Sequence, residues 1–145
     1  MKENYCSFEQ AVKLKDLGFA EKVNHAYLKK ISIEPELSVG DLKEVHSKDP
    51  KNYNDNRKGA GKGLFFYSAP ALHIAQTWLR EVKHIYVYPE INCLKKWFAK
   101  AVDIERNEDL IWDGTMFDTY ELALSAGIDK ALELLGKEPL QNNRL

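Results

Sequence analysis

The sequence has few cysteines, no long apolar run and no excess of either charge. Its 145 residues include only Cys6 and Cys93, with no Cys-x-x-Cys pair, so a disulfide-rich secreted fold is excluded. The first residues lack the apolar core of a signal peptide, and no apolar run approaches the roughly 20 residues that cross a bilayer. We therefore expect a cytoplasmic protein with reduced thiols and no membrane contact.

The charge balance disfavours general binding to nucleic acid. The chain has 21 Lys and Arg against 22 Asp and Glu, a formal net charge of -1. Proteins that bind phosphate backbones without specificity usually carry a basic field, which this composition does not provide.

Motifs for nucleotide, metal and catalytic sites are also missing. The glycine-rich segment 58–63 departs from the Gly-x-x-x-x-Gly-Lys-Ser/Thr spacing, and an apolar run follows it where a phosphate-binding loop would be followed by a helix. None of the four histidines is paired with another in the way of a His-Glu-x-x-His site, so no metal site is predicted from them. Cys6, just before a helix start, is the better candidate nucleophile, but a reactive thiol needs a neighbouring cation that the sequence does not show. We predict no catalytic residue, no metal and no cofactor.

Two helices are predicted before residue 85. The first begins at Ser7, which forms a capping box with Gln10, and ends at Gly18. The second has Pro70 in its first turn and runs to about Lys83, with an apolar stripe formed by Ala71, Ala75, Trp78 and Val82.

A third helix is predicted near the C-terminus. Asp118 is its expected cap, with Glu121 three residues on, and Gly136 is its expected end. Gly127 inside this helix costs about 1 kcal/mol relative to Ala. We take it as a sign that another backbone passes close by, with a glycine that no contact requires as the alternative.

The remaining segments predict strands and loops. In the N-terminal half, residues 23–33 predict a strand, which we place at a sheet edge because it contains two lysines. The pattern of residues 34–46 does not decide their secondary structure, and a helical turn near Asp41 is one option. Residues 47–63 are polar and turn-rich and predict an exposed flexible loop. Further strands are expected at 64–67, 85–88, 96–104 and 110–112.

Together these elements predict an α+β protein with helices on one face of an antiparallel sheet. The core order is α-β-β-β-α after an N-terminal helix and strand. The expected divisions are an N-terminal extension packing on the core (1–46), a flexible loop (47–63), the α+β core (64–136) and a frayed tail (137–145).

Three blocks of the sequence resemble a known group of proteins. The blocks are SFEQAVKLKDLGF from Ser7, YSAPALHIAQTWLREVK from Tyr67 and TYELALSAGIDKALELL from Thr119. They are similar to small uncharacterised proteins found in phages, prophages and gut anaerobic bacteria. That group has no established activity, so the resemblance implies a setting and carries over no catalytic residue.

The leading functional hypothesis is a non-enzymatic adaptor or protein-interaction module, with an unknown partner or a second copy. Strand side chains alternate, so either Trp97 or Phe98 faces away from the helices and leaves an apolar spot on the open sheet. These two residues are the candidate contacts.

The alternative hypothesis is a nucleic-acid-binding accessory protein. The α-β-β-β-α order is that of the double-stranded-RNA-binding fold, but the last helix here begins with carboxylates that would repel phosphate. The candidate contacts of this alternative are Arg57, Lys58, Lys62, Arg80 and Lys83.

Overall fold

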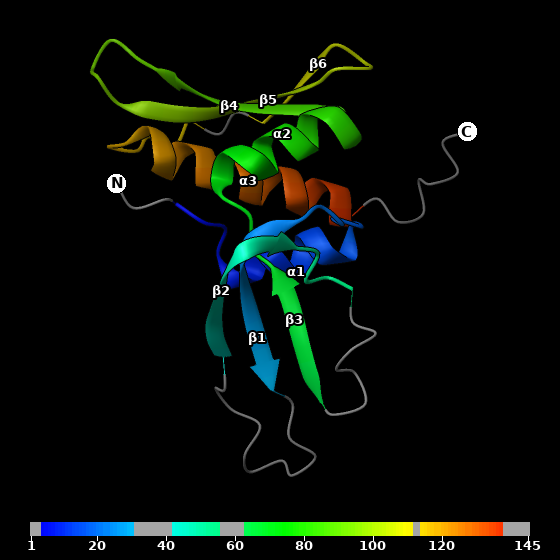
Figure 1. Cartoon of the computed structure of the whole chain (residues 1–145). Helices are drawn as coiled ribbons and strands as arrows, with labels where there is room; N and C mark the ends of the chain where they lie inside the picture. Colours follow the sequence, from blue (N-terminus) through cyan, green and yellow to red (C-terminus); the bar gives the residue numbers. More distant parts are fainter. Residues whose placement is uncertain (1–3, 31–41, 56–62, 112–113, 138–145) are drawn as a thin grey trace. The chain divides into compact units, whose positions relative to one another are not determined.

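The computed structural model describes residues 4–30, 42–55, 63–111 and 114–137. Within these residues lie three helices and two three-stranded antiparallel sheets (Figure 1), which confirms the α+β class. The chain divides into two compact units. We call Ser7–Pro70 the N-terminal unit, and Ala71–Leu145 together with Met1–Cys6 the C-terminal unit.

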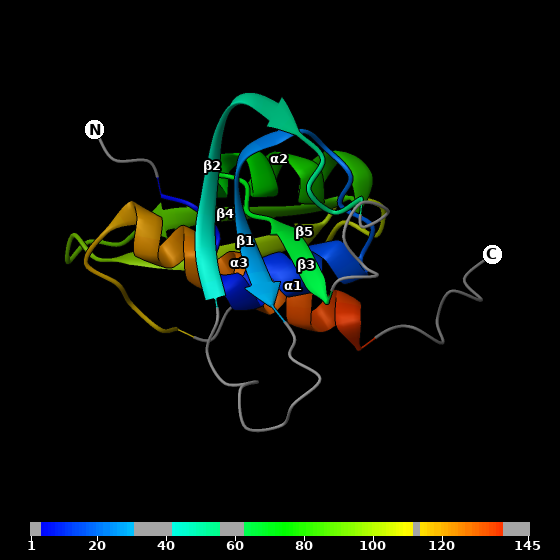
Figure 2. The same ribbon diagram turned by 60° about the horizontal axis from the view of Figure 1, so that its bottom comes forward.

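The N-terminal unit consists of one helix and one sheet. Its elements are α1 (Phe8–Asp16), β1 (Val23–Lys30), β2 (Leu42–Lys51) and β3 (Leu64–Ser68). The strand order is β2-β1-β3, so β1 lies in the middle, as Figure 2 shows. The predicted edge position of this strand is therefore wrong. A central strand can contain Lys29 because the long apolar part of its side chain covers apolar surface. The Lys29 ammonium group lies 5.7 Å from the centre of the Phe8 ring.

Strand β2 corrects the predicted loop at 47–63. Residues 47–51 belong to this strand: Lys51 lies opposite Val23 of β1, and the side-chain amide of Asn24 donates to the carbonyl of Ser47 at 2.9 Å. The strand is polar because it lies at a sheet edge and is mostly exposed. An edge strand also tolerates Pro50, which has no N–H to donate. Residues 31–41, with the option of a turn near Asp41, and 56–62 lie outside the described residues.

Helix α1 confirms the local signals at both of its ends. Ser7 and Gln10 form the capping box. At the other end, Gly18 has φ +94, and the N–H of Phe19 donates to the carbonyl of Leu14 at 2.9 Å. This is a Schellman ending, and Leu14 and Phe19 are both buried.

Pairing between β1 and β3 places the boundary between the two units later in the chain than we predicted. Tyr27 lies opposite Tyr67, and Leu28 opposite Phe66. Residues 64–70 therefore belong with the N-terminal unit, and the core that we expected at 64–136 begins instead at Ala71.

The C-terminal unit has the predicted α-β-β-β-α order. Its elements are α2 (Leu72–Val82), β4 (Ile85–Ile91), β5 (Trp97–Asp103), β6 (Glu108–Ile111) and α3 (Tyr120–Gly136). The strand order is β4-β5-β6, and both helices lie on the same side of the sheet (Figure 1). No helix in the described part of the chain is long and apolar enough to span a membrane.

Both helix starts in this unit differ from the prediction by a residue or two. Pro70 precedes the N-cap, Ala71, so it stands outside the first turn of α2. The cap of α3 is Thr119, whose hydroxyl accepts from the N–H of Leu122, and Asp118 instead forms an ion pair with Lys96. Val82, which we expected in the apolar stripe of α2, is 49% exposed at the end of that helix.

Gly127 does mark a close approach, but of side chains and not of a backbone. A Cβ at this position would lie 2.6 Å from Cγ1 of Val87 and 3.1 Å from Cβ of Ala99. The missing side chain lets α3 lie tightly on β4 and β5.

Candidate protein-interaction surface

Strand β5 sends its two candidate aromatic residues to opposite faces. Trp97 lies on the helix side, where its ring meets that of Tyr120 of α3 edge-on with centroids 5.4 Å apart. Phe98 lies on the other face, opposite Glu90 of β4. Both are half-buried. Phe98 is therefore the residue on the open face, and Trp97 is part of a contact between sheet and helix.

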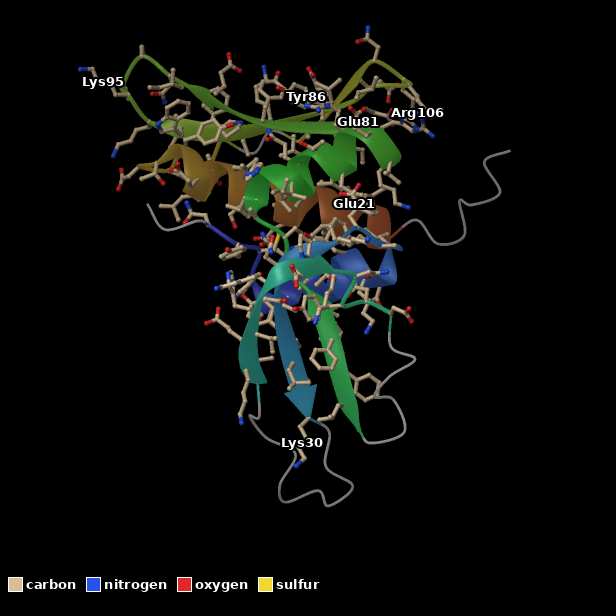
Figure 3. All side chains as sticks on the ribbon, in the orientation of Figure 1. Glu21, Lys30, Glu81, Tyr86, Lys95 and Arg106 are labelled. Atoms are coloured by element: carbon tan, nitrogen blue, oxygen red, sulfur yellow. The ribbon has the colours of Figure 1, made fainter. Side chains whose placement is uncertain are left out.

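The open face around Phe98 is mixed in chemistry. Tyr86 and Tyr88 stack with ring centroids 4.8 Å apart, and Figure 3 shows Tyr86 on the side away from α2 and α3. Lys100 forms an ion pair with Glu90 at 3.2 Å, and the hydrogen bond from this pair raises the pKa of Lys100. The aromatic and charged groups of this face already contact one another, so little of its apolar surface is free to contact a partner.

The turn between β4 and β5 exposes much more apolar surface. The side-chain oxygen of Asn92 accepts from the N–H groups of Leu94 and Lys96, which closes a tight loop. Lys95 adopts φ +60, a left-handed conformation that favours glycine. Leu94 is 71% exposed, and Lys95 projects from this end of the sheet in Figure 3.

Three segments that carry exposed or half-buried apolar side chains come together beside this turn, and we call these side chains the hairpin-end cluster. Ile91 lies opposite Trp97 in the strand pairing, and the ring of Trp97 contacts Tyr120. The side-chain amide of Asn92 contacts the sulfur of Met116 at 3.0 Å. Exposed fractions are 50% for Ile91, 50% for Met116 and 39% for Tyr120. The cluster consists of Ile91, Leu94, Trp97, Met116 and Tyr120.

Charges of both signs surround the hairpin-end cluster. Lys96 forms an ion pair with Asp118, and this contact lowers the pKa of the Asp118 carboxyl. Lys95 and Glu121 are exposed, and neither has an ion pair within the described residues. Two lysines and two carboxylates leave the rim without net charge, and Glu121 also lies favourably in the first turn of α3.

The neighbouring sheet edge is closed to strand pairing. The side-chain amide of Gln76 on α2 donates to the carbonyl of Val87 on β4 at 2.7 Å. Pro89 removes a donor from the same edge. Edge strands treated in this way rarely accept an added strand. A partner at this end would therefore contact side chains.

The basic residues of the nucleic-acid alternative are brought together only in part. Arg80 and Lys83 share α2, where the Arg80 guanidinium lies 5.9 Å from the ring centre of Tyr86 and the Lys83 ammonium 5.6 Å from that of Trp78. Arg80 is also 3.6 Å from the carboxylate of Glu81. Arg57, Lys58 and Lys62 lie outside the described residues.

Groups of catalytic type have unfavourable surroundings. Burial raises the pKa of the Cys6 thiol to about 12, with a smaller contribution from Asp129, so this cysteine is almost entirely protonated at neutral pH. Nowhere in residues 4–30, 42–55, 63–111 and 114–137 do three or more His, Cys, Asp or Glu form a group able to hold a metal ion.

A cavity in the C-terminal unit is small. It has a volume of about 110 Å³, well below the roughly 300 Å³ at which ligand pockets begin. Two of its charged lining residues already contact each other, because the N–H of Arg106 donates to the carboxylate of Asp103 at 3.1 Å. The cavity has room for a few water molecules.

Comparisons with protein-family models, with curated proteins and with solved structures gave no significant match. The hairpin-end cluster therefore rests on the geometry alone. Sequence reasoning named Trp97 but missed the four other members of the cluster. The available signal was Leu94, a large apolar residue within the otherwise polar turn 92–96.

Proposed function

We propose that this chain is a small non-enzymatic protein-interaction module that contacts its partner through the hairpin-end cluster. This proposal is supported chiefly by Ile91, Leu94 and Met116, which are each at least half exposed and lie in the segments joined by the Ile91–Trp97 pairing, the Trp97–Tyr120 ring contact and the Asn92–Met116 contact. Contiguous exposed apolar residues inside a polar rim are typical of protein contact sites. Trp and Tyr are also the residue types that most often dominate binding energy.

The proposed setting is a bacterial cytoplasm, in an accessory role of phage type. The three sequence blocks that resemble small phage and prophage proteins support this setting. The two cysteines support it as well, since Cys6 is buried, Cys93 is exposed and the two form no disulfide.

Nucleic-acid binding is the weaker alternative because of charge. The rim of the cluster has as many carboxylates as lysines, and Lys100 on the open face is paired with Glu90. Phosphate binding draws its affinity from cations that are free to replace counterions. Neither surface supplies such cations in excess.

One affinity experiment tests both functions. The tagged chain is purified from its native host at moderate salt, beside Leu94→Ser and a matched control, Ile104→Ser. Ile104 is 47% exposed in the turn between β5 and β6, outside the cluster. A stoichiometric partner retained by the wild type and by Ile104→Ser, but lost with Leu94→Ser, supports the proposal. Nuclease-sensitive nucleic acid recovered equally with all three chains would contradict it and favour the alternative.

A further inference from the structure

We infer that the partner of the hairpin-end cluster is a second copy of this chain. Two clusters pack against each other about a two-fold axis, with Lys95 of one copy facing Glu121 of the other. This inference rests on the proposed function and names its partner.

Charge complementarity is the main argument for a second copy. The turn supplies Lys95 and the first turn of α3 supplies Glu121, while the Trp97–Tyr120 contact lies between these two segments. Both charges are exposed, and neither has an ion pair within the described residues. A two-fold axis through the cluster would place each lysine against the carboxylate of the other copy, so that the surface is complementary to itself. Two-fold dimers are the commonest symmetric assemblies and require this property.

The balance of the rim also disfavours other occupants. An anionic membrane or a phosphate backbone would need a net positive rim, and here Lys96 is already paired with Asp118. A partner strand added to β4 would meet Pro89 and the carbonyl of Val87, which Gln76 occupies. What remains exposed is an apolar centre with one unpaired charge of each sign.

The conformation of Lys95 gives an independent indication. A lysine at φ +60 is strained, and glycine or asparagine would be the relaxed choice in this turn. Residues in such conformations persist where the surrounding structure fixes them, and they cluster at functional sites. Contact with a second copy would make this turn such a site.

Sedimentation equilibrium of the full chain, over a wide range of concentration, tests the inference. The wild type and a control, Lys130→Glu on the exposed side of α3, are expected to form dimers with the same dissociation constant. Lys95→Glu and Glu121→Lys each create two like-charge pairs in the dimer, and each should weaken dimerisation by about tenfold or more. Far-ultraviolet circular dichroism of each variant confirms that it is folded.

Mixing the two charge variants gives the decisive result. Every mixed dimer has two opposite-charge pairs: the two introduced residues face each other, and the unchanged Lys95 of one copy faces the unchanged Glu121 of the other. Dimers in an equal mixture should therefore return to the wild-type level, a rescue in trans that is specific to two-fold pairing of these residues. Failure of the mixture to recover would overturn the inference, as would a dimer unaffected by Leu94→Ser. A chain that stays monomeric would overturn it too, yet Leu94-dependent capture of a different protein would leave the proposed function standing.

Discussion

At the scale of single residues, Gly127 shows how packing outweighs helix propensity. Alanine in place of a helical glycine gains about 1 kcal/mol of helix stability. Here, however, the new Cβ would lie 2.6 Å from Cγ1 of Val87, a buried β-branched side chain in a strand that cannot turn away easily. Overpacking of a close contact costs about 1–3 kcal/mol. Gly127→Ala should therefore lower the free energy of unfolding.

Gly136 is the matched control for this prediction. A Cβ at Gly136, the last residue of α3, would meet nothing within 4 Å. Gly136→Ala should leave stability unchanged or raise it by up to about 1 kcal/mol. Urea titration of both variants provides the measurement. If both substitutions raised stability alike, the tight approach of α3 to the sheet would be disproved.

At the same scale, Lys95 should limit the stability of its turn. A left-handed conformation costs an L-residue roughly 1–2 kcal/mol, whereas glycine adopts it freely at a smaller entropic cost of about 0.5–1 kcal/mol. At a concentration low enough for the chain to be monomeric, Lys95→Gly should therefore raise the thermal midpoint. The control is Lys96→Gly. Lys96 does not have positive φ, and its substitution removes the ion pair with Asp118, so the thermal midpoint should fall. A fall in both variants would show that the turn is not strained at Lys95.

At the scale of elements, the free edge of β4 is protected by α2. The side-chain amide of Gln76 donates to the carbonyl of Val87 across 2.7 Å. Gln76→Leu keeps the volume but leaves that carbonyl without its donor, and the expected loss of stability is about 0.5–1.5 kcal/mol. In Thr77→Ala, the lost hydrogen bond goes to the carbonyl of His73 in the same helix, and the change should stay within about 0.5 kcal/mol. Chemical denaturation compares the two, and equal losses would contradict a protective role for Gln76.

The contrast between α1 and β2 shows which elements the sequence could predict. Helix α1 was predictable at both ends because the capping box and Gly18 act within a few residues. Strand β2 was not, since its polar residues have no alternation and its formation depends on pairing with β1. The same dependence on β1 explains why β3 was assigned to the wrong part of the chain.

The candidate surface was predictable only in part, for a similar reason. Alternation along β5 is local, and it correctly required Trp97 and Phe98 to face opposite ways. The hairpin-end cluster forms only when Met116 and Tyr120 reach the turn between β4 and β5. No periodic pattern in the sequence connects these segments.

At the scale of the whole molecule, the C-terminal unit is built from two segments that are far apart in the sequence. Residues 4–6 belong with the C-terminal unit, although the whole N-terminal unit, Ser7–Pro70, follows them. Tyr5 forms an antiparallel bridge with Ala71, and the N–H of Leu72 donates to the carbonyl of Asn4 at 2.8 Å. Cys6 is fully buried beside them. The first residues are therefore part of the structure that begins at Ala71.

This connection predicts that a change at the N-terminus destabilises the C-terminal unit. Replacing Asn4-Tyr5-Cys6 by Gly-Ser-Gly keeps the length but removes the buried Cys6 side chain and raises the backbone entropy of the unfolded chain. The free energy of unfolding should therefore fall by about 1–3 kcal/mol. Trp78 and Trp97 both lie in the C-terminal unit, so tryptophan fluorescence during urea unfolding reports on it. Cys93→Gly, which replaces an exposed cysteine in the turn, is the control and should shift the midpoint less. An unchanged fluorescence midpoint in the Gly-Ser-Gly variant would show that the N-terminal residues do not stabilise this unit.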